Sequence, residues 1–422
     1  MKQDATLQSD KDVAKELFTL IKQDTNEVVN SSRTNDFKIL RGDSCLTKEK
    51  FEMMNLPENL LKSIYAAGYD KPSKIQQAAI PHIQNEFDLA FQSQSGTGKT
   101  VAFAVGMLCK IKQGCGPQAV ILSPTRELNT QIYNEIKKFT DFLKIKCYLA
   151  LVDRKLENID HEIILGSPGS IFTLFIRKKI NPDNIKIMVL DETDVLLDKS
   201  TMGAQSFRLL KILEKTQKIY ISATYNEDVN RVIEAYSPKC TLLLEDKNTK
   251  PDQIRLYHLD IEFRNRLNAL KIIYEVLTVA QVIVFVNTKK TVKYLQQVLE
   301  EDLNSVSILH GDLTVEERDL AVENFKTSKS KILITTDVFS RGMDIPQVNL
   351  IINYELPYFK DKMQVDTYTH RIGRSGRFGR VGFVIDMICG EIQLKEYILC
   401  QEALASISKK FTVDALIEAC DN

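Results

Sequence analysis

A glycine-rich turn after a short apolar run is the first place where this sequence could do chemistry. The run Leu89-Ala-Phe-Gln-Ser-Gln-Ser-Gly-Thr-Gly-Lys-Thr100 leads into Val101–Val105, which is typical of the start of a helix. In a strand–turn–helix of this kind, backbone amides and the helix N-terminus attract phosphate, a lysine reaches the outer oxygens, and a hydroxyl binds Mg²⁺. We therefore expect a phosphate site made of Ser93, Gln94, Ser95, Gly96, Thr97, Gly98, Lys99 and Thr100, with Ser93 where the usual motif has glycine.

Carboxylates at the end of a second apolar run, Ile187-Met-Val-Leu-Asp-Glu-Thr-Asp194, could complete such a site. Asp191 can hold Mg²⁺ through water, and Glu192 can orient or deprotonate the water that attacks the γ-phosphate. Thr193 lies among these carboxylates and could add a hydroxyl to the site, while both Asp191 and Glu192 are kept. The spacing from the glycine-rich turn predicts that the two strands lie side by side in one sheet.

Apolar runs that alternate with amphipathic stretches indicate the elements that must position these groups. The pattern predicts an α/β fold in which parallel sheets are covered on both faces. The predicted strands include 119–122, 185–190, 219–221, 282–286, 332–335 and 350–353. The polar segment Glu245–Asp252 separates two halves of similar character, so we expect two tandem domains. The predicted parts are an N-terminal extension (1–44) outside the core, a first domain (45–244), a short linker (245–254) and a second domain (255–422).

Composition limits the class of protein further. Lysine plus arginine and aspartate plus glutamate number 56 each among 422 residues, so any contact with nucleic acid must be local. The eight cysteines form no CxxC pair, which favours reduced thiols over a zinc site. The N-terminus lacks the apolar region of a signal peptide, and no apolar run approaches the ~20 residues that span a bilayer. We expect an intracellular protein that is not embedded in a membrane.

From Phe51 to Arg380 the chain resembles the DEAD-box family of RNA helicases. The matching motifs are Gly68–Gln76, the turn SQSGTGKT, Pro124–Leu128, Asp191–Asp194, Ser222–Thr224, Ile283–Phe285, His310–Asp312, Thr336–Asp344 and His370–Arg377. The resemblance implies two RecA-like domains that bind ATP with Mg²⁺ and grip single-stranded RNA by its backbone, so that base sequence matters little.

The same resemblance implies a role for each matching residue. Gln76, whose amide can read an adenine edge, would select the base, and Asp344 would contact the ribose. Catalysis would depend on Lys99, Asp191, Glu192 and two arginine fingers, Arg374 and Arg377. Thr100 and Asp191 would hold the metal, and Ser222 and Thr224 would couple hydrolysis to RNA. The RNA-binding residues would be Thr125, Arg126, Gly169, Gly311, Arg318 and Thr336.

Three details are similar to the mRNA-export branch of the family: SQSGTGKT, Val306–Leu313 and the long segment Tyr358–Thr369. That likeness implies a monomer in cytoplasm and nucleus that remodels messenger ribonucleoprotein at the cytoplasmic face of the nuclear pore. Its partners would be a nucleoporin and an activator that depends on inositol hexakisphosphate. Two alternatives remain: a translation-initiation helicase with other partners, or an RNA clamp that binds ATP and scarcely hydrolyses it.

Overall fold

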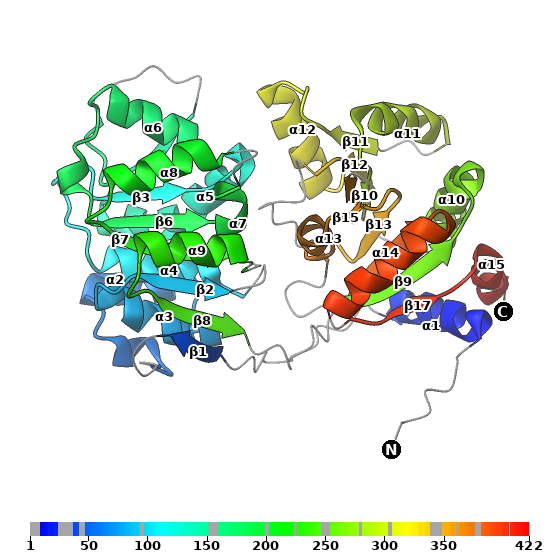
Figure 1. Ribbon diagram of the computed structural model, residues 1–422, viewed down its shortest axis with the longest axis horizontal. Coiled ribbons are helices and arrows are strands. Elements are labelled where there is room, and N and C mark those ends of the chain that lie inside the picture. The colour runs from blue at the N-terminus through cyan, green and yellow to red at the C-terminus, as the bar shows by residue number, and fades with distance from the viewer. Residues whose placement is uncertain are drawn as a thin grey trace. The chain divides into compact units, whose positions relative to one another are not determined.

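In the computed structural model the chain forms two units, each built around its own sheet (Figure 1). The structure describes residues 9–23, 37–41, 47–92, 97–151, 159–198, 202–222, 225, 227–245, 254–277, 281–302, 306–337, 348–359, 362–375, 381–404 and 406–421. The sequence's prediction of tandem α/β domains is confirmed.

The first domain contains an eight-stranded sheet in the order β1-β8-β2-β7-β6-β3-β5-β4. Its strands are β1 (Phe37–Arg41), β2 (Leu89–Gln92), β3 (Ala119–Leu122), β4 (Cys147–Ala150), β5 (Ile163–Gly166), β6 (Ile187–Asp191), β7 (Gln217–Ser222) and β8 (Thr241–Glu245). All neighbouring pairs are parallel except β1 with β8. The central strands are buried along their length, as expected for a parallel sheet covered on both faces.

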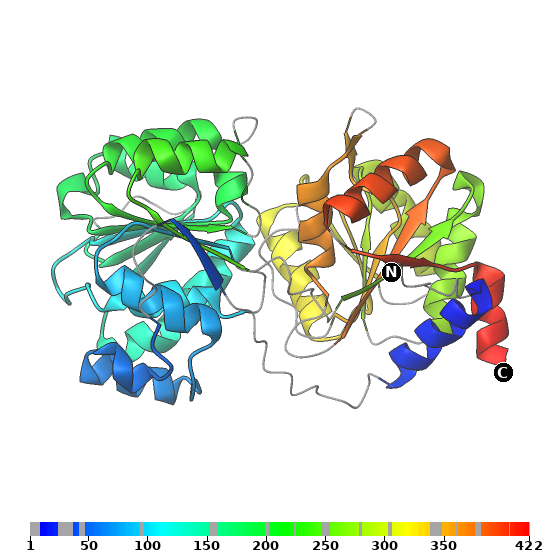
Figure 2. The same cartoon turned by 60° about the horizontal axis from the view of Figure 1, so that its bottom comes forward.

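Two apolar layers cover this sheet. One layer packs helices α2 to α5 through residues such as Ile80, Phe103 and Phe139. The other packs α6, α8 and α9 through residues such as Ile171, Leu209 and Ile233. Figure 2 shows helices on both sides of the sheet. The helices of the domain are η1 (Phe51–Met54), α2 (Glu58–Ala66), α3 (Lys74–Gln84), α4 (Lys99–Leu108), α5 (Arg126–Leu143), α6 (Pro168–Ile176), η2 (Pro182–Asn184), α7 (Thr193–Leu196), α8 (Gly203–Ile212) and α9 (Glu227–Tyr236).

The second domain has a seven-stranded parallel sheet in the order β11-β12-β10-β13-β16-β9-β17. These strands are β9 (Ile254–Asp260), β10 (Val282–Phe285), β11 (Val306–Leu309), β12 (Ile332–Thr335), β13 (Leu350–Asn353), β16 (Gly382–Ile388) and β17 (Ser408–Lys410). The other elements are η3 (Phe263–Asn265), α10 (Arg266–Leu277), α11 (Lys289–Asp302), α12 (Val315–Lys326), the hairpin β14 (Tyr358–Phe359) and β15 (Lys362–Met363), α13 (Val365–Ile372), α14 (Gly390–Ala403) and α15 (Val413–Asp421).

The N-terminal segment differs from the prediction of an extension outside the core. Helix α1 (Asp10–Gln23) buries Val13, Leu17 and Ile21 in the apolar core of the second domain. It lies beside α15 (Figure 2). Strand β1 instead pairs with β8 of the first domain. The sequence showed the apolar period of α1, but its partners are hundreds of residues away, so periodicity could not reveal its burial.

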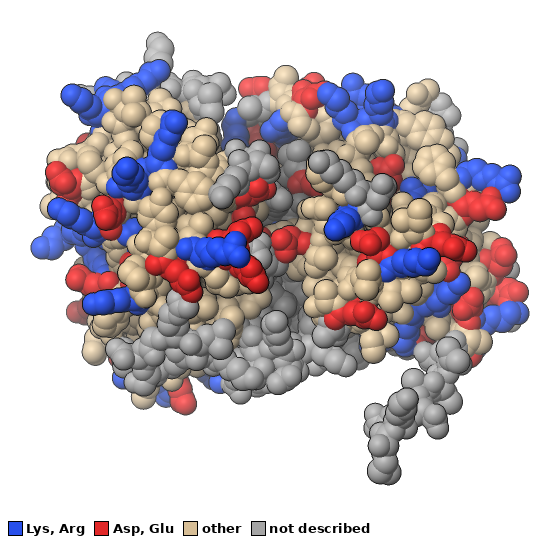
Figure 3. All heavy atoms as spheres, viewed as in Figure 1, with Lys and Arg blue, Asp and Glu red and all other residues tan. Residues whose placement is uncertain are grey.

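The distribution of charged side chains on the surface and the hydropathy of the helices are those expected from the composition. On the face drawn in Figure 3, basic and acidic side chains are interspersed, as the equal numbers of the two charges suggest. Among the described residues, no helix is both long enough and apolar enough to cross a membrane.

Candidate nucleotide and RNA site

Three adjacent strands, β2, β7 and β6, bring the candidate nucleotide residues to one edge of the first sheet. The chain leaves β2 toward the glycine-rich turn, β6 ends at Asp191, and β7 ends at Ser222. The prediction that the strands before the turn and before Glu192 are direct neighbours is wrong, because β7 lies between them. Spacing along the chain does not determine strand order, so the sequence could not show this. The consequence is that Ser222, at the end of β7, lies between the ends of the two strands that carry the candidate nucleotide residues.

The end of the glycine-rich turn meets Gln76. Gly98 has φ +90° and caps helix α4, a conformation that favours glycine. A Cβ atom at Gly98 would collide with Nε2 of Gln76, so a larger residue would displace that amide. The Gln76 amide donates to Gly98 O at 3.1 Å and accepts from Ser73 N at 2.9 Å. Each amide atom can form one further hydrogen bond, which leaves capacity to contact an adenine edge.

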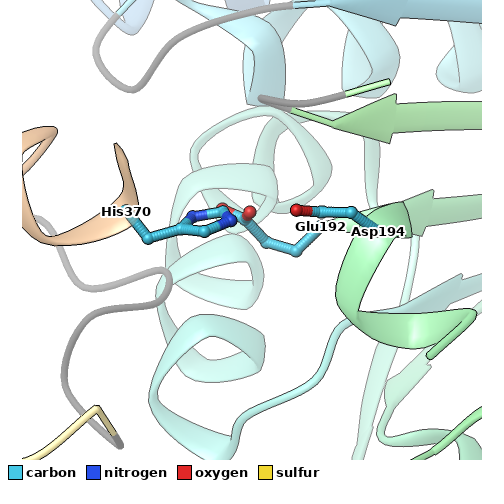
Figure 4. Close-up of side chains that lie close together, drawn as sticks. All are labelled: Glu192, Asp194 and His370. Carbon is cyan, nitrogen blue, oxygen red and sulfur yellow. The ribbon is translucent and has the colours of Figure 1, made fainter. Parts of the chain in front are cut away.

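Lys99, Asp191 and Glu192 form the charged centre of this edge. Lys99 Nζ lies 3.5 Å from Asp191 Oδ1 and 3.3 Å from Glu192 Oε1. Both carboxylates are buried. Glu192 has φ +58°, which turns the chain out of β6 and into the short helix α7. Figure 4 shows the side chains of Glu192 and Asp194 on this turn.

The Asp191 carboxyl suits a metal ion. Burial is the largest influence on its pKa and raises it, the ammonium group of Lys99 lowers it, and the charge of Glu192 raises it, with a net upward shift. Its Oδ2 atom is buried and has no hydrogen-bond partner among the described residues. A divalent cation would satisfy this oxygen and favour its ionised form. Thr100, in the first turn of α4, carries the second candidate metal-binding oxygen.

The candidate RNA residues of the first domain lie at the ends of the neighbouring strands β3 and β5. Thr125 caps helix α5 by accepting a hydrogen bond from Leu128 N at 3.2 Å, and Arg126 begins that helix. Gly169 lies in the first turn of α6, with no heavy atom within 4 Å of a hypothetical Cβ. These groups share the edge of the sheet that carries the nucleotide residues, since all these strands are parallel.

In the second domain, β11 and β12 bring together the other candidate RNA residues. Gly311 follows β11, and Arg318 on α12 donates to its carbonyl oxygen at 2.5 Å. Thr336 follows β12, and its amide donates to Leu309 O at 3.3 Å. The structure thus gathers Gly311, Arg318 and Thr336 at one sheet edge.

Arg374 lies in the turn that follows α13. Its Nε atom donates to His370 O at 3.3 Å, and its side chain is buried. Several predicted site residues lie outside the described ranges, among them Ser93, Gln94, Ser95, Gly96, Asp344 and Arg377. Thr224 also lies outside them, whereas Ser222 is buried at the end of β7.

Sequence reasoning gave no role to Arg371, which organises the second domain. Its fully buried guanidinium donates to Asp337 Oδ1 (2.7 Å), Glu355 O (2.6 Å) and Asn287 Oδ1 (3.0 Å). The same group lies over the ring of Phe285, 5.2 Å from its centroid. Since Arg371 is on α13, these contacts fix the helix from which Arg374 follows. The sequence carried no signal for this role beyond the place of Arg371 within the motif His370–Arg377.

A buried carboxylate, that of Asp386 on β16, also contacts helix α13. It accepts hydrogen bonds from Asn353 Nδ2 at 2.7 Å, Tyr368 Oη at 2.6 Å and Tyr397 Oη at 2.7 Å. Burial raises the pKa of Asp386 to about 6, although the three hydrogen bonds lower it. Tyr368 and Arg371 are both on α13, so the hydrogen bonds of these two residues attach that helix to the rest of the domain at two points.

Two domains of the RecA type with a phosphate-binding turn in the first define the class of tandem-domain helicases. Residues 73–232 match the family model of the DEAD/DEAH box helicase, and residues 265–379 match the helicase conserved C-terminal domain. The chain is 38% identical over 393 residues to the ATP-dependent RNA helicase DBP5 of Kluyveromyces lactis. This match covers 90% of the present chain and 83% of the relative. The chain therefore belongs to the DEAD-box family of ATP-dependent RNA helicases.

Solved structures of a yeast relative agree with this assignment. The fold is similar to S. cerevisiae Dbp5 bound to RNA and ADP BeF3, with a TM-score of 0.84 and 36% identity over 89% of this chain and 98% of that one. A variant of the same yeast protein bound to Nup159, a Gle1 variant, IP6 and ADP gives a TM-score of 0.62 at 35% identity, covering 87% and 98% of the two chains. The present chain is accordingly a nucleotide-binding protein.

Proposed function

We propose that this helicase hydrolyses Mg²⁺-bound ATP at the β2–β7–β6 edge and remodels messenger ribonucleoprotein during export from the nucleus. The observation that carries the chemistry is the placement of Lys99 within 3.5 Å of both Asp191 and Glu192. Lys99 would bind the outer phosphates, and Glu192 would accept a proton from the attacking water. Thr100 and Asp191 would hold the metal, which supplies charge neutralisation on the phosphates.

RNA recognition would rest on groups that follow parallel strands in each domain. Thr125, Arg126 and Gly169 in the first domain, and Gly311, Arg318 and Thr336 in the second, offer amides, hydroxyls and guanidinium groups suited to a sugar–phosphate backbone. Such contacts read no base edges, so binding should depend little on sequence. Arg374 and Arg377 would stabilise the charge that develops on the transferred phosphoryl group.

The test is ATP hydrolysis by the purified chain, with and without single-stranded RNA. We expect RNA to raise turnover, and single-stranded DNA of the same sequence to raise it less. Equal, near-zero turnover in every sample would contradict hydrolysis and favour the RNA clamp. Turnover that one base motif alone stimulates would contradict backbone recognition.

The export role and the partners are the finer part of the proposal. Similarity to DBP5 proteins, one of which binds Nup159, Gle1 and IP6, favours this branch over a translation-initiation helicase. The chain would then act in cytoplasm and nucleus, as a monomer that associates with the cytoplasmic face of the nuclear pore. Binding of the purified chain to a Nup159-type nucleoporin, and stimulation of its turnover by a Gle1-type activator with IP6, would test this. A chain that responds to neither would fit the translation-initiation alternative.

A further inference from the structure

Thr193 differs from the other residues of the Asp191–Asp194 turn because its polar group faces into the sheet. Its side chain is fully buried. The hydroxyl donates to Leu190 O at 2.9 Å and accepts from Ile221 N at 3.0 Å. One side-chain oxygen therefore joins the last residues of β6 to the last residues of β7.

The geometry of β6 explains why a hydroxyl is useful at this point. Asp191 is the last residue of β6 paired with β7, opposite Ile221. Glu192 then turns away with φ +58°, and the hydrogen bond from Ile221 N goes to the Thr193 side chain. A buried amide without a partner costs about 1–3 kcal/mol, and the Thr193 hydroxyl supplies the acceptor that Ile221 N requires.

The two positions joined in this way adjoin residues with assigned roles. Thr193 directly follows Glu192, and Ile221 directly precedes Ser222. The other side of β7 is held as well: the Tyr225 hydroxyl lies 2.9 Å from Tyr220 O and 3.2 Å from Phe91 O of β2. The exit of β7 is thus tied to both neighbouring strands of the nucleotide site.

We propose that Thr193 is a positioning residue, whose hydroxyl holds Ser222 in register with Asp191 and Glu192 so that RNA binding is transmitted to hydrolysis. Thr193 touches neither phosphate nor attacking water in this role; it acts through the β6 and β7 backbones. The inference rests on the proposed function, because it assumes that Ser222 couples RNA to the nucleotide site.

A matched residue separates this role from ordinary stabilisation. Thr216 is also buried, and its hydroxyl donates to Ile185 O at 3.1 Å. It therefore connects the start of β7 to the segment just before β6, at the sheet edge opposite the nucleotide residues. Thr193→Val and Thr216→Val each remove one threonine hydroxyl that connects β6 and β7 or the segments next to them. The two hydroxyls lie at opposite ends of this strand pair.

The experiment measures ATP turnover of the full chain against RNA concentration at saturating ATP, together with nucleotide affinity and thermal melting. We expect Thr193→Val to lower RNA-stimulated turnover about tenfold, since small misplacements of catalytic groups have effects of this size or larger. RNA-free turnover and nucleotide affinity should stay close to those of the parent. Thr193→Ser, which keeps the hydroxyl, should restore the stimulated rate, and Thr216→Val should keep it. If Thr193→Val does not fold, Thr193→Ala serves the same comparison.

Several outcomes would overturn the inference. Parental RNA stimulation in Thr193→Val would show that the hydroxyl does not position Ser222. An equal loss in Thr216→Val, or failure of Thr193→Ser to restore the rate, would reduce Thr193 to a residue that only stabilises the sheet. A parent chain without RNA-stimulated turnover would instead overturn the proposed function, and this inference with it.

Discussion

The side-chain nitrogen of Lys99 lies 3.3 Å from Oε1 of Glu192, so the candidate phosphate-binding lysine and the candidate general base form an ion pair. The two groups reach each other from α4 and from the turn after β6. The position of each side chain therefore depends on both α4 and the turn after β6. A substitution at Glu192 removes one partner of this ion pair.

Glu192→Gln should abolish hydrolysis while ATP-dependent RNA binding survives. An amide keeps the shape of the carboxylate but cannot accept the proton, and loss of a general base lowers rates by about 10²–10⁴. The measurement is turnover beside RNA binding in the presence of ATP. A control is Glu162→Gln, which alters a buried carboxylate that accepts from Gly114 N and Lys146 N, each at 2.7 Å. Loss of RNA binding in Glu192→Gln alone would indicate that Glu192 has a structural role.

Arg374→Ala should lower RNA-stimulated hydrolysis about 10³-fold or more, the effect of removing an arginine finger in other nucleotide hydrolases. Its nucleotide affinity should change little, because the candidate phosphate and metal residues Lys99, Asp191 and Glu192 lie in the first domain. Arg371→Lys is the contrasting variant. A lysine cannot reproduce the bonds of Arg371 to Asp337, Glu355 and Asn287, so the second domain should melt at lower temperature. Near-parental turnover in Arg374→Ala would remove this residue from the mechanism.

Asp386 should make the second domain lose stability as pH rises from about 4 to 7. Its pKa is about 6 in the folded protein against 3.8 without burial, so the folded state binds the proton more tightly than the unfolded state. The stabilising effect is complete below the unfolded pKa and is lost as the pH rises through the folded one. Each pKa unit corresponds to about 1.4 kcal/mol, so the loss is about 3 kcal/mol.

Denaturant unfolding of the parent and Asp386→Asn across this pH range would test that linkage. The amide does not titrate, so the variant should lack this part of the decline, and the difference between the two proteins should change by about 3 kcal/mol. Identical pH slopes in both proteins would mean that Asp386 keeps an ordinary carboxyl pKa.

Leu17→Ala should destabilise the second domain by about 2–4 kcal/mol, because it leaves a cavity under α1. Leu17 is fully buried in the apolar core of that domain. Thr19→Ala on the exposed side of the same helix is the control and should change stability by no more than about 0.5 kcal/mol. Equal, small effects from both changes would show that α1 contributes little to this core.

The sequence predicted those features that depend on local pattern. Apolar runs identified β3, β10, β12 and β13 within a residue of their bounds, and the glycine-rich turn placed the start of α4. Strand order escaped prediction, because nothing in the spacing between Lys99 and Asp191 indicates that β7 lies between their strands.

The sequence also could not predict contacts between segments that lie far apart along the chain. Glu16 pairs with Lys409 at 2.6 Å, and Thr193 accepts a hydrogen bond from a strand that begins more than twenty residues later. Residue type alone suggested a hydroxyl at Thr193 but not its acceptor or donor. Only the fold shows that this side chain lies between two strand ends.

The position of α1 has a consequence for the order in which the chain matures. During synthesis α1 leaves the ribosome ahead of the whole first domain, whereas its partners in the second domain, including β9, α10 and α15, follow much later. Domains generally fold as units in the order of their synthesis, so the first domain can complete its sheet while α1 still exposes Val13, Leu17 and Ile21. The nascent chain therefore exposes this apolar stripe until the elements of the second domain that bury it have been synthesised.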